Sequence, residues 1–242
     1  MGIVVSRNGN TNGSHAAAVP PAPATIRGLL SGTKAAVLIG VHNALGAKIA
    51  EEAGASGMCI EDNPFPKRCS FYDGMQEDLE LESTFCGKIL AAIEKRVDEG
   101  FAVIARTEAL IKDLGLDVAL ERTRAYAAAG AEGILIHHKG SDPRPVLEFA
   151  DRWYRSETVP LVCVPTTYNT VTYRQLDDAG FRLVIFANYG VRSIAKALQG
   201  TFEAVMANRR LADGDEHVVP MEEVFRLIYV DELKENEARY VR

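Results

Sequence analysis

The sequence has four cysteines and no C-x-x-C pair among them. They are Cys59, Cys69, Cys86 and Cys163, and two of them, Cys59 and Cys163, fall within apolar runs that we predict as strands. Zinc sites and disulfide frameworks need cysteines at characteristic spacings. We therefore predict reduced thiols, as in a cytoplasmic protein, and neither a zinc site nor a disulfide framework.

The sequence also lacks an excess of positive charge and a long apolar segment. Its 242 residues carry a net charge of -6, which offers no basic surface to nucleic acid. We expect no signal peptide and no membrane span, because no apolar stretch is long enough for either. Residues 1–24 mix Asn, Gly, Ala and Pro without an apolar period, so we expect a disordered tail there.

Short apolar runs that end in polar residues recur along the rest of the chain. The run at residues 58–60 ends in Glu61 and Asp62, and the run at residues 101–105 ends in Arg106. Similar runs followed by polar side chains lie at residues 36–41, 133–136, 161–164 and 183–187. Apolar runs of this length, bounded by turn residues, are typical of buried strands, so we predict six strands.

Helical segments separate these predicted strands. Three of them end in Ala-Gly, at Gly54, Gly130 and Gly180, where glycine suits the left-handed residue that closes a helix. Alternating strands and helices predict right-handed βαβ units and a parallel sheet, with the active edge at the carboxyl ends of the strands. Because no G-x-G-x-x-G motif follows any strand, a barrel is favoured over a doubly wound sheet.

We predict a single α/β barrel domain over residues 25–242, with a helical tail at its C-terminal end. Apolar residues at helical spacing over residues 219–234 indicate that this tail is amphipathic. Such a tail packs either on its own barrel or on a second subunit.

Five segments of the chain carry a family resemblance: Ile60–Ser70, Val103–Leu110, Ile134–Lys139, Pro160–Tyr168 and Val184–Asn188. In this order they resemble successive strand ends of the phosphoenolpyruvate mutase family, within the isocitrate lyase superfamily. The resemblance runs from about Thr25 to the C-terminus. It implies a TIM-type (β/α) barrel whose last helix is exchanged between subunits, and hence a homo-oligomer, with Mg²⁺ as cofactor.

The resemblance also implies an activity and a small-molecule substrate. The family interconverts phosphoenolpyruvate and phosphonopyruvate by moving a phosphoryl group between the enolate oxygen and carbon. This isomerase reaction forms the P–C bond in phosphonate biosynthesis.

The resemblance assigns roles to residues at the predicted strand ends. Arg106 resembles the phosphoryl-binding arginine of the family, and a planar guanidinium suits phosphoryl oxygens. His137 resembles a histidine that donates to the migrating group, whereas alternation along a strand points His138 away from it. Asn188 is expected to bind substrate, and Glu61 is expected to hold Mg²⁺ through water.

The loop after the predicted strand at residues 58–60 carries further candidates. Asp62 is expected to accept hydrogen bonds from this loop. By the resemblance the loop closes over the substrate and excludes water, and Lys67, Cys69 and Ser70 are its candidate catalytic residues. Family mutases have Asn in place of Cys69, and residues 67–69 resemble the lyase branch instead, in which a cysteine acts as an acid or a base. The alternative is that Cys69 is an unreactive loop thiol.

The chain departs from the family pattern between its first two predicted strands. In the family, two further strand-helix units and an Asp-rich Mg²⁺ motif lie there, whereas here residues 41–54 lead almost directly to Glu61 and Asp62. Because one barrel unit takes roughly 30 residues, about 60 residues of the pattern have no counterpart, and about six units are left. No D-x-D pattern lies near a strand end as a direct metal ligand.

Three alternatives to mutase activity therefore stay open. The chain could be a phosphonopyruvate hydrolase, a related C–C lyase, or a catalytically impaired homologue that binds a partner subunit or a pyruvate-like ligand.

Overall fold

The computed structural model describes residues 44–66 and 78–240. It divides into two compact units, the first ending at Ala187 and the second beginning at Asn188. The tail expected at residues 1–24 and the strand expected at residues 36–41 lie outside the described residues, as do Lys67, Cys69 and Ser70. Their roles stay predictions, and so does the single barrel domain over residues 25–242.

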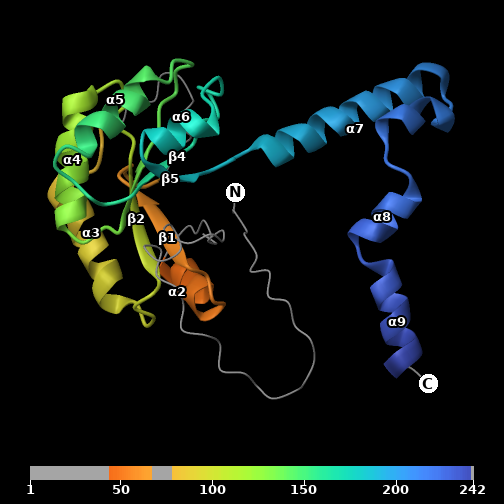
Figure 1. Ribbon diagram of the computed structural model, residues 1–242, viewed down its shortest axis with the longest axis horizontal. Coiled ribbons are helices and arrows are strands. Elements are labelled where there is room, and N and C mark those ends of the chain that lie inside the picture. Colours follow the sequence, from red (N-terminus) through yellow and green to blue (C-terminus); the bar gives the residue numbers. More distant parts are fainter. Residues whose placement is uncertain (1–43, 67–77, 241–242) are drawn as a thin grey trace. The chain divides into compact units, whose positions relative to one another are not determined.

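In the first unit, strands and helices alternate along the chain (Figure 1). The elements are α2 (Ala44–Glu52), β1 (Gly57–Glu61), α3 (Glu82–Lys95), β2 (Ala102–Thr107), α4 (Leu116–Ala128), β3 (Gly133–Ile136), α5 (Arg144–Trp153), β4 (Leu161–Cys163), α6 (Tyr173–Asp178) and β5 (Phe181–Val184). The strands form one parallel sheet in the order β1-β2-β3-β4-β5, so each strand pairs with the next along the chain. This confirms the predicted α/β class with a parallel sheet.

Five of the six predicted strands fall within the described residues, and the structure contains all five. The last one begins earlier than expected. The apolar run predicted a strand over residues 183–187, but β5 spans Phe181–Val184. Pairing with β4 decides its start, because Leu161 lies opposite Phe181 in the parallel ladder. An apolar run indicates that a strand is buried but does not indicate where its pairing begins.

Alternation of side chains gives the sheet two different faces. In β2, Val103 and Ala105 belong to the larger core cluster, whereas Ile104 points to the opposite face. Large side chains of α3, α4 and α5 pack on the first face: Phe85, Tyr126, Phe149 and Trp153. Figure 1 shows these helices along one side of the sheet. The opposite face carries a smaller cluster: Ala102, Ile104, Leu135, Val162 and Val164.

The three predicted helix-closing glycines are left-handed, as expected. Gly54, Gly130 and Gly180 have φ angles of 82°, 99° and 94°. Space is also limited at Gly180, because a Cβ atom there would lie 2.4 Å from Cε2 of Tyr154. At Gly54 a Cβ atom would meet no atom within 4 Å. The Ala-Gly signal thus marks the helix-to-strand joints correctly.

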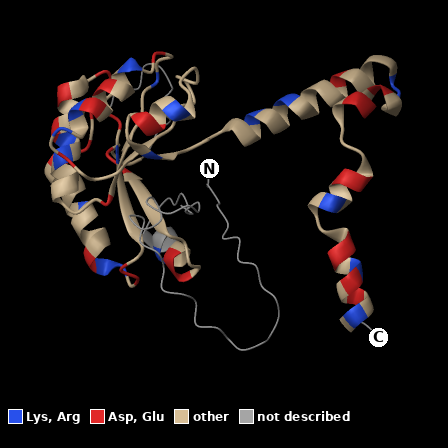
Figure 2. Cartoon of the chain, viewed as in Figure 1, with Lys and Arg blue, Asp and Glu red and all other residues tan. Residues whose placement is uncertain are grey.

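The second unit consists of α7 (Tyr189–Asn208), the 3₁₀ helix η1 (Leu211–His217), α8 (Met221–Leu227) and α9 (Val230–Tyr240). The amphipathic tail predicted over residues 219–234 is divided between α8 and α9, because Tyr229 between them has a φ angle of 56°. Acidic and basic side chains alternate along α9 (Figure 2). Within the described ranges, no helix is both long enough and apolar enough to cross a membrane.

Helix α7 carries a row of exposed apolar side chains at spacings of three and four residues. We call it the α7 stripe: Val191, Ile194, Leu198, Phe202 and Met206. Such a row on a helix is typical of a surface that packs against another element.

We expect Gly180→Ala to destabilise the protein more than Gly54→Ala does. Both substitutions place a Cβ atom on left-handed backbone, which costs about 1–2 kcal/mol. Only Gly180→Ala also forces a contact with Tyr154, and overpacking of this kind adds about 1–3 kcal/mol. Urea unfolding followed by circular dichroism would measure both free energies of unfolding. Equal losses would contradict the role of the Tyr154 contact.

Candidate active site

The carboxyl ends of β1, β2 and β3 bring three polar side chains to one face of the sheet. Glu61 lies opposite Arg106 in the register of β1 and β2, and His137 directly follows β3. By alternation these side chains lie on the face of the smaller core cluster. Their neighbours in sequence, Asp62 and Thr107, lie on the face that the helices cover.

The guanidinium of Arg106 is held between two carboxylates. Its Nε atom donates to Oε1 of Glu108 at 2.5 Å and lies 3.7 Å from Oε2 of Glu61. The Glu108 side chain is completely buried, whereas those of Glu61 and Arg106 are partly exposed. Burial lowers the pKa of Arg106, but the charges of Glu108 and Glu61 outweigh this effect and leave that pKa raised. Arg106 is therefore a fixed positive charge at the carboxyl edge of the sheet.

The carboxylate of Asp62 is completely buried and accepts four hydrogen bonds from described residues. Its Oδ2 atom accepts from the hydroxyl groups of Thr107 at 2.8 Å and Tyr126 at 2.7 Å, and from Nε of Arg122 at 3.2 Å. Its Oδ1 atom accepts from the backbone N–H of Glu108 at 2.8 Å. These four donors belong to the end of β2 and to α4, not to the loop that follows Asp62.

Arg122 also connects Asp62 to Glu80. Its Nη2 atom donates to the carbonyl oxygen of Glu80 at 2.5 Å, and the N–H of Glu80 donates to the carbonyl oxygen of Asp62 at 2.8 Å. Residues 62 and 80 are thereby held side by side against α4.

His137 is almost completely buried beside Arg106. Burial, the charge of Arg106 and the nearby His138 lower the pKa of His137 to about 3, against the opposite effect of a hydrogen bond with the backbone of Val164. The imidazole is therefore neutral at pH 7, with one donor nitrogen and one acceptor nitrogen. The ring of the buried Tyr168 lies 6.4 Å away.

Of the predicted site residues, Glu61, Arg106 and His137 come together at this edge. Asn188 directly precedes α7 and begins the second unit, so its contact with substrate stays a prediction. The loop candidates at positions 67, 69 and 70 lie outside the described residues.

Sequence patterns did not point to the donors on α4. Arg122 and Tyr126 lie four residues apart and therefore share one face of the helix. This spacing is common to many pairs of helical residues, so it did not single them out. Only the position of α4 against Asp62 distinguishes them.

The described residues provide no complete set of side-chain ligands for a metal ion. No group of three or more His, Cys, Asp or Glu side chains among them is arranged to hold one. Glu61 is a partly exposed carboxylate on the candidate face, and it also accepts from Nδ2 of Asn63 at 3.0 Å. One carboxylate of this kind fits a contact with Mg²⁺ through water rather than a complete set of ligands.

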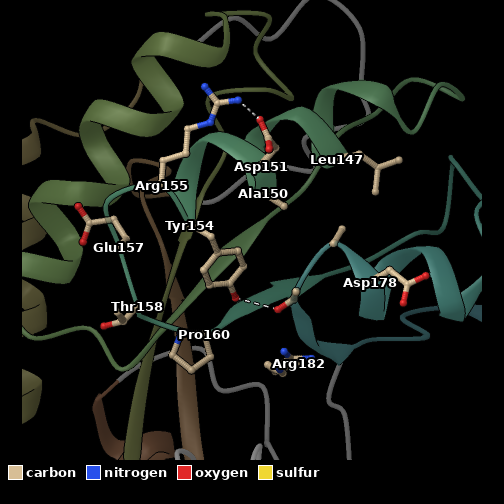
Figure 3. Close-up of a pocket in the computed structure, with 12 residues that line it drawn as sticks. Leu147, Ala150, Asp151, Tyr154, Arg155, Glu157, Thr158, Pro160, Asp178 and Arg182 are labelled. Carbon is tan, nitrogen blue, oxygen red and sulfur yellow. Dashed lines mark hydrogen bonds and ion pairs between the residues drawn. The ribbon is translucent and has the colours of Figure 1, made fainter.

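A surface cavity of about 790 Å³ lies at a different part of the first unit. Its walls include Tyr154 and Arg155 at the end of α5, Pro160 before β4, and Gly180 before β5 (Figure 3). The hydroxyl group of Tyr154 donates to the carbonyl oxygen of Gly180 at 2.8 Å. Because residues 160 and 180 precede their strands, this cavity lies at the amino edge of the sheet. Barrel enzymes place their active sites at the carboxyl edge, so we do not assign catalysis to it.

The sheet and its carboxyl edge define the class of protein. A parallel α/β sheet with polar side chains at its carboxyl edge is typical of TIM-type barrel enzymes. Solved structures of the same fold include a phosphoenolpyruvate phosphomutase and a 2,3-dimethylmalate lyase. A family model described as phosphoenolpyruvate phosphomutase matches residues 47–206. The chain belongs to this family.

Individual relatives agree with this assignment. Phosphoenolpyruvate phosphomutase of Streptomyces hygroscopicus is 37% identical over 194 residues, which are 80% of this chain and 61% of the relative. The crystal structure of phosphoenolpyruvate phosphomutase from Streptomyces platensis subsp. rosaceus has 41% identity and a TM-score of 0.79, covering 89% of this chain and 77% of that one. A phosphonopyruvate hydrolase in complex with oxalate and Mg²⁺ has 31% identity and a TM-score of 0.74, covering 90% and 77%. This chain thus spans 61% of the length of the Streptomyces hygroscopicus relative.

We expect His137 to make the stability of the fold depend on pH. Its pKa changes from 6.5 to about 3 on folding, so the unfolded chain binds more protons between these values. Stability from this group is fully present above the unfolded pKa and falls as the pH decreases below it, by at most about 1.4 kcal/mol per pH unit.

Urea unfolding of the wild type and of His137→Gln between about pH 4 and about pH 7.5 would measure this dependence. The substitution removes the titrating group, so the difference in unfolding free energy between the two proteins should shrink as the pH decreases. A difference that stays constant over this range would contradict the low pKa of His137.

Proposed function

We propose that this chain interconverts phosphoenolpyruvate and phosphonopyruvate. The observation that carries the proposal is the pairing of a fixed positive charge, Arg106, with the neutral His137 at the carboxyl edge of the sheet, in a member of the phosphoenolpyruvate phosphomutase family. Transfer of a phosphoryl group needs positive charge and hydrogen-bond donors around its oxygens. These two side chains supply both.

The reaction is an isomerisation, so it needs no oxidant, reductant or second substrate. The bond between phosphorus and the enolate oxygen breaks, a bond between phosphorus and the methylene carbon forms, and the enolate becomes a ketone. Because Nε of Arg106 is bonded to Glu108, we assign its Nη groups to the phosphoryl oxygens. His137 is neutral and has a single N–H, which the backbone of Val164 holds in this structure; in the reaction this N–H would turn from Val164 to donate to the migrating group.

The other predicted residues have proposed roles that rest on the family resemblance. Lys67, Cys69 and Ser70 would contact the substrate from the loop after β1, and Asn188 would contact it from the start of α7. Exclusion of water by such a loop determines whether the phosphoryl group ends on carbon or on water.

We propose Mg²⁺ as the cofactor, with Glu61 as a ligand through water. When bound, Mg²⁺ would supply positive charge to the carboxylate and the enolate oxygen of the pyruvate unit. A related phosphonopyruvate hydrolase has been solved with oxalate and Mg²⁺, which supports this assignment. No step of the phosphoryl transfer is assigned to the metal.

We also propose that the protein acts in the cytoplasm on a small-molecule substrate. In the part of the chain that the structure describes, Cys86 and Cys163 are free thiols. Free thiols are typical of a reducing compartment, which supports this location.

We expect Arg106→Lys to lower the turnover of phosphonopyruvate by at least about 100-fold. Lysine keeps the charge beside Glu108 but lacks the planar fork that holds two phosphoryl oxygens, and loss of one such transition-state donor costs about 10²–10³ in rate. Phosphorus NMR of phosphonopyruvate with Mg²⁺ would follow the reaction. Arg152→Lys is the matched control, because Arg152 is a partly exposed arginine of α5 that pairs with Asp117.

The same phosphorus spectra distinguish a mutase, a hydrolase and a catalytically impaired homologue, and a separate substrate tests for a lyase. A growing phosphoenolpyruvate signal supports the mutase, inorganic phosphate supports the hydrolase, and an unchanged spectrum from folded protein supports the impaired homologue. Cleavage of a 2-methylisocitrate-type substrate would indicate the lyase. Full activity of Arg106→Lys would remove Arg106 from its proposed role.

We further propose that a second copy of this chain covers the α7 stripe. Ile194 and Phe202 are each 61% exposed, and exposed apolar rows of this kind mark interaction surfaces. The exchanged last helix implied by the family resemblance supports a homo-oligomer.

Ile194→Glu should reduce the molecular mass in solution to that of one chain, because it places a charge within the α7 stripe. Ser193→Glu adds the same charge on another face of α7 and should leave the mass unchanged. Light scattering after size-exclusion chromatography would measure both. A wild type that is already monomeric at micromolar concentration would contradict the proposal.

A further inference from the structure

Three buried groups connect α4 to the candidate active site in series. The hydroxyl group of Tyr126 donates to Oδ2 of Asp62 at 2.7 Å, and Oδ1 of Asp62 accepts from the N–H of Glu108 at 2.8 Å. The carboxylate of Glu108 then accepts from Nε of Arg106 at 2.5 Å. Asp62, Glu108 and Tyr126 are all completely buried.

The direction of the Asp62 carboxylate depends on the donors of α4. Tyr126 and Arg122 both reach Oδ2, and Nε of Arg122 also donates to the hydroxyl group of Tyr126 at 2.8 Å. Because the two oxygens of a carboxylate are rigidly joined, the donors on Oδ2 also orient Oδ1, which holds the backbone of Glu108. In a site without water such hydrogen bonds are strong and strengthen one another.

Glu108 in turn determines where the charge of Arg106 lies. Its buried carboxylate holds Nε, which is the inner end of the guanidinium, and the Nη groups remain on the side that we assign to the phosphoryl oxygens. A shift of the backbone at Glu108 would therefore turn these groups. Small displacements of a positioned catalytic group are costly for the rate.

We infer that Tyr126 is a positioning residue, which acts through Asp62 and Glu108 on the guanidinium of Arg106. This inference rests on the proposed function for its effect on catalysis, but its effect on Arg106 itself does not depend on the substrate.

The test uses Tyr126→Phe in the full chain, with Tyr154→Phe as the matched control. Phenylalanine keeps the edge contact of ring 126 with Phe85, whose centroid lies 4.7 Å away, and removes only the hydroxyl group. Tyr154 is a partly exposed tyrosine at the amino edge of the sheet, where its hydroxyl group donates to Gly180 and accepts from the N–H of Leu161 at 3.2 Å (Figure 3). Tyr154→Phe thus removes two hydrogen bonds, the same number that Tyr126→Phe removes.

The first measurement needs no substrate. In protein labelled with ¹⁵N-arginine, the Nε–H signal of Arg106 is identified by its loss in Arg106→Lys, and its exchange with water is measured. Tyr126→Phe should speed this exchange by about fivefold to tenfold, as expected when one hydrogen bond of a buried network is lost. Tyr154→Phe should leave the exchange rate unchanged.

The second measurement is the kinetics of phosphonopyruvate turnover, corrected for the folded fraction. Tyr126→Phe should lower kcat by about fivefold to tenfold while KM stays nearly constant, because a group that acts in the transition state is displaced. A merely structural role would lower the stability of Tyr126→Phe but leave kcat of the folded enzyme unchanged.

The two measurements distinguish failure of the proposed function from failure of the positioning role of Tyr126. A wild type without turnover would overturn the proposed function, and the exchange rate of Arg106 would then decide the role of Tyr126 alone. An exchange rate in Tyr126→Phe within about twofold of the wild type would overturn the positioning role, whatever the turnover.

Discussion

The carboxylate of Asp62 must be satisfied inside the protein, because no water reaches it and an unpaired buried carboxylate is very costly. Four donors meet this requirement, and they come from the end of β2 and from α4. The constraint therefore fixes three elements at once: the end of β1, the turn after β2, and the helix that packs across both. Removal of one partner would leave a buried charge uncompensated, which is far more destabilising than the loss of an exposed ion pair.

The pleat of the sheet explains how the buried Asp62 network and the candidate site can be adjacent in sequence and yet lie on opposite faces of the sheet. Glu61 and Asp62 are neighbours, as are Arg106 and Thr107, and successive side chains point to opposite faces. In each pair the first residue lies at the candidate site and the second lies under α4. Each functional side chain thus has a neighbour that is fixed on the other face, since Asp62 bonds to α4 and Thr107 bonds to Asp62. The same geometry couples the packing of α4 to the placement of Arg106.

Electrostatics at the carboxyl edge follows from the same arrangement. Two carboxylates hold Arg106 charged, and the charge of Arg106 together with burial keeps His137 neutral. One cation and one neutral hydrogen-bonding ring are suited to an anionic phosphoryl group, since the site supplies a positive charge without a second titrating cation. The cavity near Tyr154 has no such combination, because its lining includes Arg155 and Arg182 but no histidine.

The order of strands and helices, the parallel sheet, the Ala-Gly joints and the polar strand ends could all be predicted from the sequence, because each depends on local propensity and on the period of apolar residues. Arg106, His137 and Glu61 could likewise be predicted as edge residues, since any residue after a parallel strand reaches that edge. The tertiary structure alone decided the start of β5, which depends on pairing with β4, and the partners of Asp62. Those partners lie up to 64 residues away in the chain, so no local pattern records them, and only packing of α4 on the sheet brings them within hydrogen-bonding distance.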